Sequence, residues 1–271
     1  MDEALKQLGI QVDITRSMLT VALVLTRILT VVTLAPFLGG KQAPPEVKMG
    51  IGMAFTIIIF PLVGRFQVGP IPVDPLNFFL MVIKEAFVGF LLGFVAAEVF
   101  YAVEMAGKIV DLVRGTNQVQ LMVPQLGERS SAFGDLNYQL MLVIFLFLGG
   151  HHVFIAALFE SFRVVPLDQY PPFTAGLWPL VEMFARLSAD IFTIGVTLAA
   201  PVAIASLITE LSFGLLNRVA PQINAYFMAM PAKVYAGSVM FLVALPMFMR
   251  ILIDHTGEST VLVRKVLLLL Q

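Results

Sequence analysis

Five charged side chains lie close together where the third apolar stretch of the sequence ends. They are Glu98, Glu104, Lys108, Asp111 and Arg114. On one continuous helix, residues three or four positions apart share a face, so Glu104 pairs with Lys108, and Asp111 with both Lys108 and Arg114. This charge ladder has two interpretations. It is either a solvated helix end with local ion pairs, or a row buried against a neighbouring subunit, where the loss of one partner costs about 3–5 kcal/mol.

Four more charged residues interrupt apolar runs elsewhere. They are Arg27, the adjacent Lys84 and Glu85, and Glu210. Charged side chains within membrane segments are costly unless they pair or face a water-filled cavity. Because the chain's own spans offer no obvious partner for all of them, we predict that these residues and the charge ladder form a network that assembles with other subunits.

A polar segment broken by proline follows the run that carries Glu210. This helix-break segment comprises Asn217, Arg218, Pro221, Gln222, Asn224, Pro231 and Lys233. Polar backbone without partners is tolerated at membrane depth only where it is buried in protein or lines water. We therefore expect Arg218 and Asn224 to hydrogen-bond free carbonyls at the break or in a neighbouring subunit, a task that suits a planar guanidinium.

The sequence predicts a long irregular loop over residues 115–134, which contains Gly115, Gly127 and Gly134. Loops of about this length are usually functional or disordered, and an apolar patch beside glutamines argues against simple disorder. The predicted plug residues are Gln118, Gln120, Leu121, Met122, Val123 and Pro124. They either close a conduit, as an adaptable apolar seal can, or pack into the chain's own fold.

Patterns for catalysis and metal binding are missing from the sequence. His151 and His152 are adjacent, so on a helix they point about 100° apart and cannot chelate as an i, i+4 pair would. The chain has no Cys and a formal net charge of −1, which exclude a thiolate metal site and argue against nucleic acid as a partner. We expect no cofactor and no enzymatic activity.

The composition places these residues in a polytopic membrane protein. The chain has 271 residues, of which 59% are hydrophobic and 13% charged, with a mean hydropathy of +0.91. Six apolar stretches reach about the 17–25 residues that a bilayer requires. They cover residues 17–38, 49–64 (short for a span), 76–103, 137–160 (the cleanest), 180–209 and 232–253. The tail STVLVRKVLLLLQ reads as a short amphipathic or packing helix.

Lysine and arginine residues fall almost equally on the two sides of a six-span topology, so the positive-inside rule assigns no orientation. Either acidic neighbours and miscounted spans blur the rule, or some helices do not span lipid in the final state. The segment MDEALKQLGIQVDITRS has no basic n-region and no small-residue cleavage site, so we expect no cleaved signal peptide.

Three blocks carry a family resemblance. The first block is RILTVVTLAPFLGGKQAPPEVKMGIGMAF. It begins with an apolar helix that carries an arginine, continues through a proline and a turn that contains glycine, and ends with a helix that starts with proline followed by a basic residue. KEAFVGFLLGFVAAEVFYAVEMAGKIVDLVRG has spaced glycines and ends in Asp111-x-x-Arg114-Gly115, and GLLNRVAPQINAYFMAMPAK is the most specific block. Together they resemble the FliR/SctT family of type III secretion export proteins, which includes SpaR, YscT and EscT. The Asp-x-x-Arg-Gly form is closer to the injectisome branch than to the flagellar one.

The resemblance implies an all-α export-gate domain over residues 1–271, with helical parts at 1–114 and 135–271 and a plug-like loop at 115–134. It implies a helical, pore-forming assembly with SctR/FliP-type and SctS/FliQ-type subunits. Further implied partners are a SctU/FlhB-type switch protein, inner-rod or needle proteins, secreted substrates in transit and membrane lipid. The location is the bacterial inner membrane, with helices drawn toward the periplasm in the assembled complex.

Two other classes of protein have some of these features. A secondary transporter also has broken helices and midplane charges, but it predicts inverted similarity between halves, which the sequence does not show. An intramembrane enzyme needs a nucleophile and base or a metal set, and the sequence offers neither.

Overall fold

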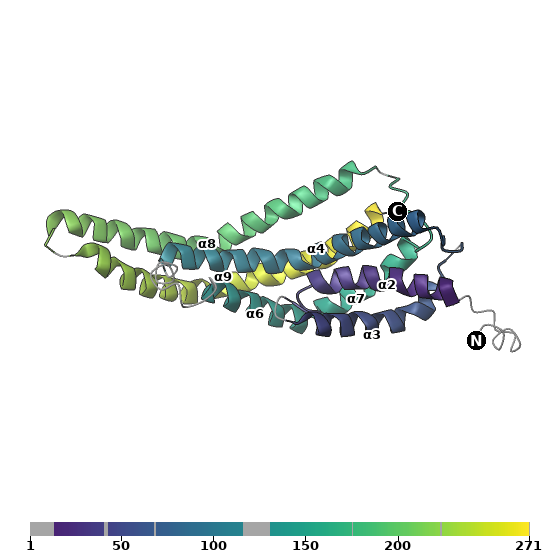
Figure 1. The fold of residues 1–271 in the computed structure, drawn as a ribbon. Coiled ribbons are helices and arrows are strands. Elements are labelled where there is room, and N and C mark those ends of the chain that lie inside the picture. Colours follow the sequence, from purple (N-terminus) through teal and green to yellow (C-terminus); the bar gives the residue numbers. More distant parts are fainter. Residues whose placement is uncertain are drawn as a thin grey trace, which may run out of the picture. The chain divides into compact units, whose positions relative to one another are not determined.

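The computed structural model describes residues 14–40, 43–67, 69–115, 131–174, 176–222 and 224–270. These ranges contain seven α-helices and no strand (Figure 1). The helices are α2 (Ile14–Leu34), α3 (Pro45–Val63), α4 (Pro75–Arg114), α6 (Ala132–Phe147), α7 (Gly150–Val164), α8 (Trp178–Val219) and α9 (Ala225–Leu269). The prediction of an all-α protein is confirmed.

Five of these helices are long and apolar enough to cross a membrane, and a sixth span results if α6 and α7 count as one bent span. The prediction of a polytopic membrane protein with about six apolar helices is therefore confirmed. The second stretch is longer than predicted, because α3 begins at Pro45 and has 19 residues. The tail is not a separate helix, since it continues α9, which has 45 residues.

The fourth apolar stretch, predicted as the cleanest span, is divided into two helices. α6 and α7 are bent by 74° at the short break between them. The break lies at Gly149, whose φ of 75° is a conformation that glycine adopts without steric cost. An apolar run of sufficient length therefore does not form one straight helix here.

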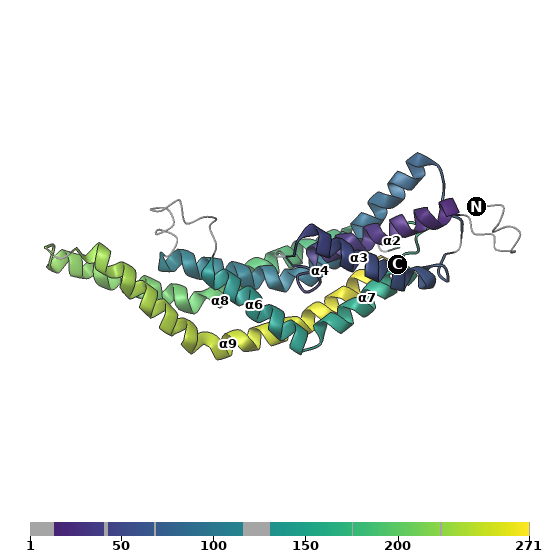
Figure 2. The same ribbon diagram turned by 60° about the horizontal axis from the view of Figure 1, so that its bottom comes forward.

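The chain divides into two compact units, each built from separate segments. Unit 1 comprises residues 1–97, 151–181 and 260–271, and unit 2 comprises residues 98–150 and 182–259. In unit 1, α2 and α3 pack side by side, as Figures 1 and 2 show. Glycines permit the close packing, since a Cβ at Gly52 would lie 2.6 Å from Leu29 Cδ2, and one at Gly89 would lie 2.6 Å from the Arg27 carbonyl oxygen.

Unit 2 contains the C-terminal part of α4, α6, and most of α8 and α9. The end of α8 and the beginning of α9 form an antiparallel hairpin (Figures 1 and 2). A small cluster of Val110, Ala199 and Val202 packs against Phe133 and Phe241. α4 and α6 approach closely where two glycines meet, because a Cβ at Gly107 would lie 2.5 Å from Gly134 Cα.

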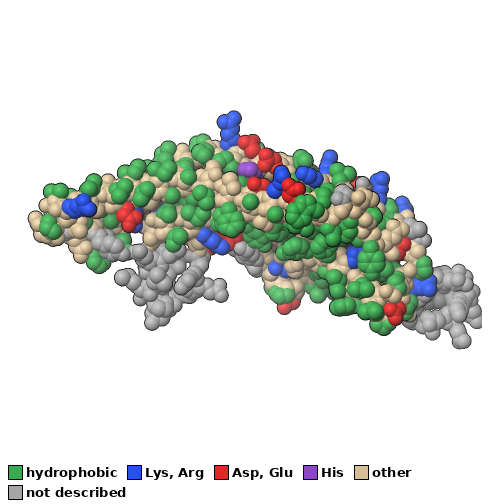
Figure 3. Space-filling view, turned by 90° about the horizontal axis from the view of Figure 1, so that it is seen from above, with side chains coloured by type: hydrophobic (Ala, Val, Ile, Leu, Met, Phe, Trp, Pro, Cys, Tyr) green, Lys and Arg blue, Asp and Glu red, His purple; other side chains and the backbone are tan. Residues whose placement is uncertain are grey.

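Large apolar side chains remain exposed on most helices of the chain, and they cover much of the face in Figure 3. On α8 they occur along its whole length, at Trp178, Val181, Phe192, Val196, Ile204, Leu207, Ile208, Leu211, Leu215, Leu216 and Val219. Exposed apolar surface of this extent requires cover from lipid or from other protein chains.

Candidate functional site

Three charged side chains meet in the interior of unit 1. Arg27 comes from α2, and Lys84 and Glu85 come from α4. The Glu85 carboxylate accepts a hydrogen bond from Arg27 Nε, and it forms an ion pair of 2.7 Å with Lys84 Nζ. The side chains of Arg27 and Glu85 are fully buried, and that of Lys84 is 5% exposed. One carboxylate thus compensates two cations away from solvent.

The same two cations bind the C-terminal end of α7 and the turn that follows it. Arg27 donates hydrogen bonds of 2.8 Å to the carbonyl oxygens of Ser161 and Val165. Lys84 Nζ donates bonds of 2.9–3.0 Å to the carbonyl oxygens of Pro166, Leu167 and Gln169. The last carbonyls of a helix lack donors within the helix and carry the negative end of its dipole, so two cations stabilise this end.

The sequence offered no obvious partner within the chain for all of the charges in its apolar runs, but the structure shows such partners for three of them. Arg27, Lys84 and Glu85 are paired within the chain, and the Arg27 guanidinium also lies 4.2 Å from the ring centre of Phe162. Their partners come from α2, α4 and the end of α7, so the cluster ties three helices of unit 1 together.

The charge ladder lies on α4 as one continuous helix, and its two ends differ. Lys108 Nζ and Glu104 Oε1 form an ion pair at 2.7 Å, with the Lys108 side chain 58% exposed. Asp111 and Arg114 are 3.9 Å apart and almost fully buried. The buried half is covered by residues of unit 2 itself, whereas the two interpretations from the sequence were a solvated helix end or a neighbouring subunit.

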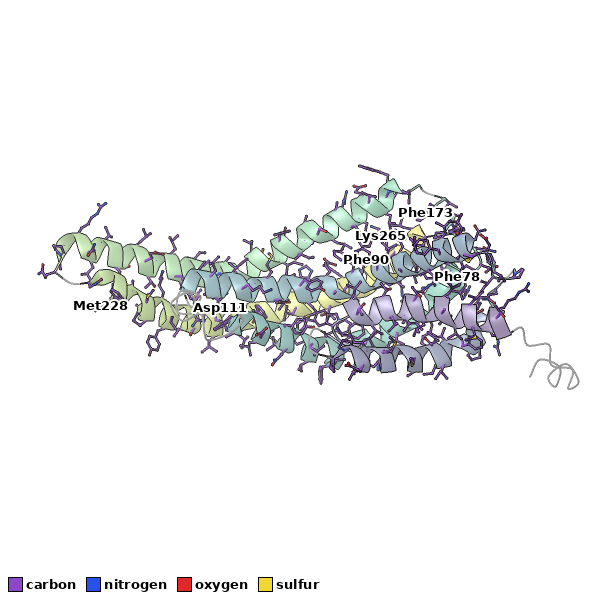
Figure 4. The ribbon with its side chains drawn as sticks, in the orientation of Figure 1. Phe78, Phe90, Asp111, Phe173, Met228 and Lys265 are labelled. Carbon is purple, nitrogen blue, oxygen red and sulfur yellow. The ribbon has the colours of Figure 1, made fainter. Side chains whose placement is uncertain are left out.

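Asp111 holds the beginning of α6. Its carboxylate accepts hydrogen bonds from Ser131 Oγ at 2.7 Å and from the Phe133 backbone N–H at 3.0 Å. Ser131 is in turn the N-cap of α6, where its hydroxyl accepts from the Gly134 N–H at 2.9 Å. Figure 4 shows Asp111 near the C-terminal end of α4. The carboxylate therefore keeps residue 131 close to the end of α4.

Arg114 connects α4 to α9. Its Nη2 donates to the Val234 carbonyl oxygen at 3.1 Å and to Ser238 Oγ at 2.8 Å, and its guanidinium lies 4.3 Å from the ring centre of Phe133. Gly237 makes room for this contact, because a Cβ there would lie 2.9 Å from Arg114 Cγ. Arg114 thus joins α4, α6 and α9 within unit 2.

Glu98 stands apart from the other ladder residues. The residue is 3% exposed, yet its Oε2 has no hydrogen-bond partner among the residues that the structure describes. Both polar side-chain atoms of Asn137, which is 1% exposed, are also without such a partner in the described ranges. Buried polar groups are normally hydrogen-bonded, so both positions are unusual, although unit 1 also has buried side-chain nitrogens without such a partner, at Gln67 and His151.

The break between α8 and α9 includes fewer residues than the predicted helix-break segment. Asn217 and Arg218 belong to the last turn of α8, and Pro221, Gln222 and Asn224 lie in the turn before α9. Pro231 and Lys233 lie inside α9, where Lys233 pairs with Glu210 at 3.5 Å.

The polar side chains at the break make few contacts in the described structure. The Asn224 Oδ1 is 3.5 Å from the Phe227 N–H, at the outer limit of a hydrogen bond. Arg218 is exposed, and no hydrogen bond from its guanidinium to a carbonyl is found within the described residues. The expected pairing of Arg218 and Asn224 with free carbonyls is therefore not seen within this part of the chain.

The plug prediction falls on residues outside the described part of the chain. These are Gln118, Gln120, Leu121, Met122, Val123 and Pro124. The structure does describe both flanks of that stretch. α4 ends at Arg114, the next residue, Gly115, has a φ of 77°, and the chain is described again from Ser131, which Asp111 binds.

Several residues that complete these clusters were not predicted from the sequence. They are Ser131, Phe133, Phe162, Gly237 and Ser238. Only Ser131 carries a local signal, since a serine before an apolar run, with Asp135 in the first turn, is typical of a helix start. Within the described ranges, no three His, Cys, Asp or Glu side chains are placed to hold a metal ion.

Comparisons with known proteins agree with the resemblance. The pattern of the family described as bacterial export proteins, family 1, matches residues 18–259. Yop proteins translocation protein T of Yersinia pestis is 32% identical over 252 residues, or 92% of this chain and 93% of that protein. The secretion system apparatus protein SsaT of Salmonella typhimurium is 28% identical over 217 residues, which cover 80% and 83% of the two chains.

A flagellar relative is similar over nearly the same range. The flagellar biosynthetic protein FliR of Bacillus subtilis is 26% identical over 224 residues, which cover 82% of this chain and 85% of FliR. The family match extends from α2 into α9 and so includes the charged clusters of both units. The chain therefore belongs to the bacterial export proteins, family 1, which confirms the FliR/SctT family that its three sequence blocks resemble.

Proposed function

We propose that this chain is a structural and gating subunit of a type III protein secretion apparatus, and that it forms the entry of the substrate channel. Its partners there are SctR/FliP-type and SctS/FliQ-type subunits, a SctU/FlhB-type switch protein, and the inner-rod or needle proteins. Secreted proteins pass through the channel. The names of the relatives, which refer to Yop protein translocation, a secretion system and flagellar biosynthesis, support this function.

The observation that carries the proposal is the length of the exposed apolar surface on α8. This helix has 42 residues, so it is roughly 63 Å long at about 1.5 Å per residue, whereas the hydrocarbon core of a bilayer is about 30 Å thick. Exposed apolar side chains run from Trp178 to Val219. A bilayer covers about half of that length along the helix, and this supports cover by other protein chains over the rest.

The same argument applies to α9. Its 45 residues have a length of roughly 67 Å measured along the helix, and its exposed apolar side chains occur from Phe227 to Leu268. Helices of this kind suit an assembly in which part of each helix leaves the bilayer and packs against neighbouring subunits. In the proposed complex, that part lies on the periplasmic side of the inner membrane.

An injectisome is favoured over a flagellum within this family. The support is the 32% identity to the Yop translocation protein, against 26% to FliR of Bacillus subtilis, and the Asp111-x-x-Arg114-Gly115 form; FliR of Caulobacter vibrioides, at 29%, and SsaT, at 28%, are equally distant from this chain. The decisive experiment replaces the homologous gene with this one in an injectisome-bearing strain and, separately, in a flagellated strain. Restored effector secretion without restored motility supports the injectisome. Motility alone contradicts the preference, and rescue of neither function contradicts the export role.

We further propose that residues 115–134 close the channel at rest, as part of one export-gate domain. The support is the position of this stretch, whose two flanks are joined by the bond between Asp111 and Ser131. Deleting residues 118–125 should leave the complex assembled and make membranes that contain it leak ions. Conductance across such membranes tests the proposal, and an unchanged seal in an assembled complex contradicts it.

A further inference from the structure

Two apolar hollows flank α7 in unit 1. The larger has a volume of about 680 Å³ and lies between α7 and the C-terminal end of α9, where Leu267 and Leu268 line it. The smaller has a volume of about 260 Å³ and lies between α7 and the end of α3, where Ile59 and Leu62 line it. Both are open to the surface, so each is accessible to a molecule from the surrounding membrane.

The two hollows meet at two residues of α7. Ala156 and Glu160 line both of them, and because they are four positions apart, they lie one above the other on the helix face between the hollows. Ala156 is small and exposed, so its side chain projects only a short distance from α7 between the two hollows. A forked apolar molecule can therefore straddle α7 at Ala156 and place one limb in each hollow.

Charged side chains of both signs line the two hollows near this part of α7. Glu160 lines both hollows, Arg163 lines the smaller one, and Arg264 lines the larger one. Glu160 and Arg163 are 3.9 Å apart, with side chains 55% and 71% exposed, so their mutual pairing is weak. Figure 4 shows Lys265, the neighbour of Arg264, on the same part of α9.

We propose that these hollows bind one diacyl phospholipid whose head group carries both an ammonium and a phosphate. The two acyl chains occupy the two hollows, the ammonium faces the Glu160 carboxylate, and the phosphate faces the guanidinium groups of Arg163 and Arg264. Guanidinium groups suit phosphate because their donors match its oxygens. A helix is about 10 Å across and fits two separate hollows of this size less well than two slender chains do. The inference requires a membrane location and does not depend on the export function.

The test is native mass spectrometry of the full chain purified in detergent, with added phosphatidylethanolamine or phosphatidylglycerol of the same acyl composition. The wild-type chain should retain one phosphatidylethanolamine in preference to phosphatidylglycerol, which has no ammonium. Ala156→Phe raises the helix surface between the hollows and should lower that retention roughly tenfold. Glu160→Gln should lower the retention of phosphatidylethanolamine by a similar factor and leave phosphatidylglycerol unchanged.

Matched controls come from α8. Ala185 is an exposed alanine, and Glu182 pairs with Arg186 in an exposed i, i+4 contact, so Ala185→Phe and Glu182→Gln should retain lipid as the wild type does. If Ala156→Phe does not fold, Glu160→Gln carries the test alone.

Three outcomes overturn the proposal. They are equal retention of both lipids by the wild type, equal retention by Glu160→Gln and Glu182→Gln, and cross-linking of an Ala156→Cys variant to another protein chain in the assembled complex. The last outcome would assign the hollows to a protein partner.

Discussion

The buried charges of unit 1 and those of unit 2 are compensated in different ways. In unit 1, Arg27 and Lys84 share the Glu85 carboxylate and the carbonyls at the end of α7. In unit 2, Asp111 and Arg114 are 3.9 Å apart and bind mainly other groups. Glu98 Oε2 has no hydrogen-bond partner in the described part of the chain.

This difference indicates different tasks for the two units. A shared carboxylate together with several carbonyl acceptors holds three helices in one arrangement. If any one of these helices moves, a buried charge loses its partner. A buried polar group without a partner is costly, and it persists more readily where another chain supplies the partner. We therefore expect the helices joined at Glu85 in unit 1 to resist local change strongly, and the surroundings of Glu98 in unit 2 to depend more on assembly.

Removing the shared carboxylate should produce the largest effect. Glu85→Ala leaves two buried cations without a counter-charge and should lower the free energy of unfolding by about 3–5 kcal/mol. Denaturant unfolding of the purified chain measures this. Glu182→Ala, which breaks only the exposed pair with Arg186, should cost less than about 1 kcal/mol. Equal losses in the two variants would contradict the role of the unit 1 cluster.

The corresponding change in unit 2 should cost less. Asp111→Ala removes the acceptor of two hydrogen bonds from residues 131 and 133 and should lower the free energy of unfolding by about 2–3 kcal/mol. Arg186→Ala breaks a pair whose two side chains are both largely exposed and serves as the control, with an expected loss below about 1 kcal/mol. If Arg186→Ala costs as much as Asp111→Ala, the buried half of the ladder is not what joins α4 to α6.

Close packing between α4 and α6 can be tested through Gly107. A Cβ there would meet Gly134, so Gly107→Ala should destabilise the chain by about 1–3 kcal/mol through overpacking. Gly257 lies inside α9 with nothing within 4 Å of its added Cβ, so Gly257→Ala should leave stability unchanged or raise it by up to about 1 kcal/mol. Equal thermal midpoints of the two variants would exclude a tight α4–α6 contact.

Glutamine substitutions sharpen the comparison between the units. Glu98→Gln removes a charge that has no hydrogen-bond partner in the described structure at Oε2 and should change the free energy of unfolding by less than about 1 kcal/mol, or stabilise the chain. Glu85→Gln removes a charge that compensates two cations and should be clearly destabilising. A destabilising Glu98→Gln together with a neutral Glu85→Gln would reverse the comparison.

The smallest effect on the chain itself is expected at Arg218, which is exposed at the end of α8. Arg218→Ala should change the stability of the isolated chain by less than about 0.5 kcal/mol and should still lower the yield of the assembled complex. Arg218→Lys should restore that yield only in part, since an ammonium lacks the planar set of donors. Normal assembly and secretion by Arg218→Ala would show that this residue has no role in assembly.

The helices themselves follow well from the sequence. Long apolar runs predict α2, α4, α8 and α9, and the spacing of the charge ladder predicts that α4 continues to Arg114. The break between α6 and α7 was missed because an apolar run has the same composition whether it is straight or bent. The adjacent Gly149 and Gly150 are the only local sign of the bend.

The partners of the charged residues could not be predicted in the same way. Arg27 binds groups 58 and 138 residues away, and Arg114 binds Ser238 across 124 residues. No periodic pattern encodes such pairs, because they depend on which helices pack together. The helix-break segment was predicted too long for a related reason, since Pro231 is accommodated within the first turns of α9.

The central claim is that the chain is a subunit whose exposed apolar helices are covered by other export proteins. Its most direct test is coexpression with SctR-type and SctS-type subunits, followed by native mass spectrometry of the purified material. The account predicts one complex of fixed stoichiometry that contains this chain, and a higher yield of the chain than in expression alone. A monodisperse, thermally stable chain that remains alone in detergent and gains nothing from these partners would contradict it.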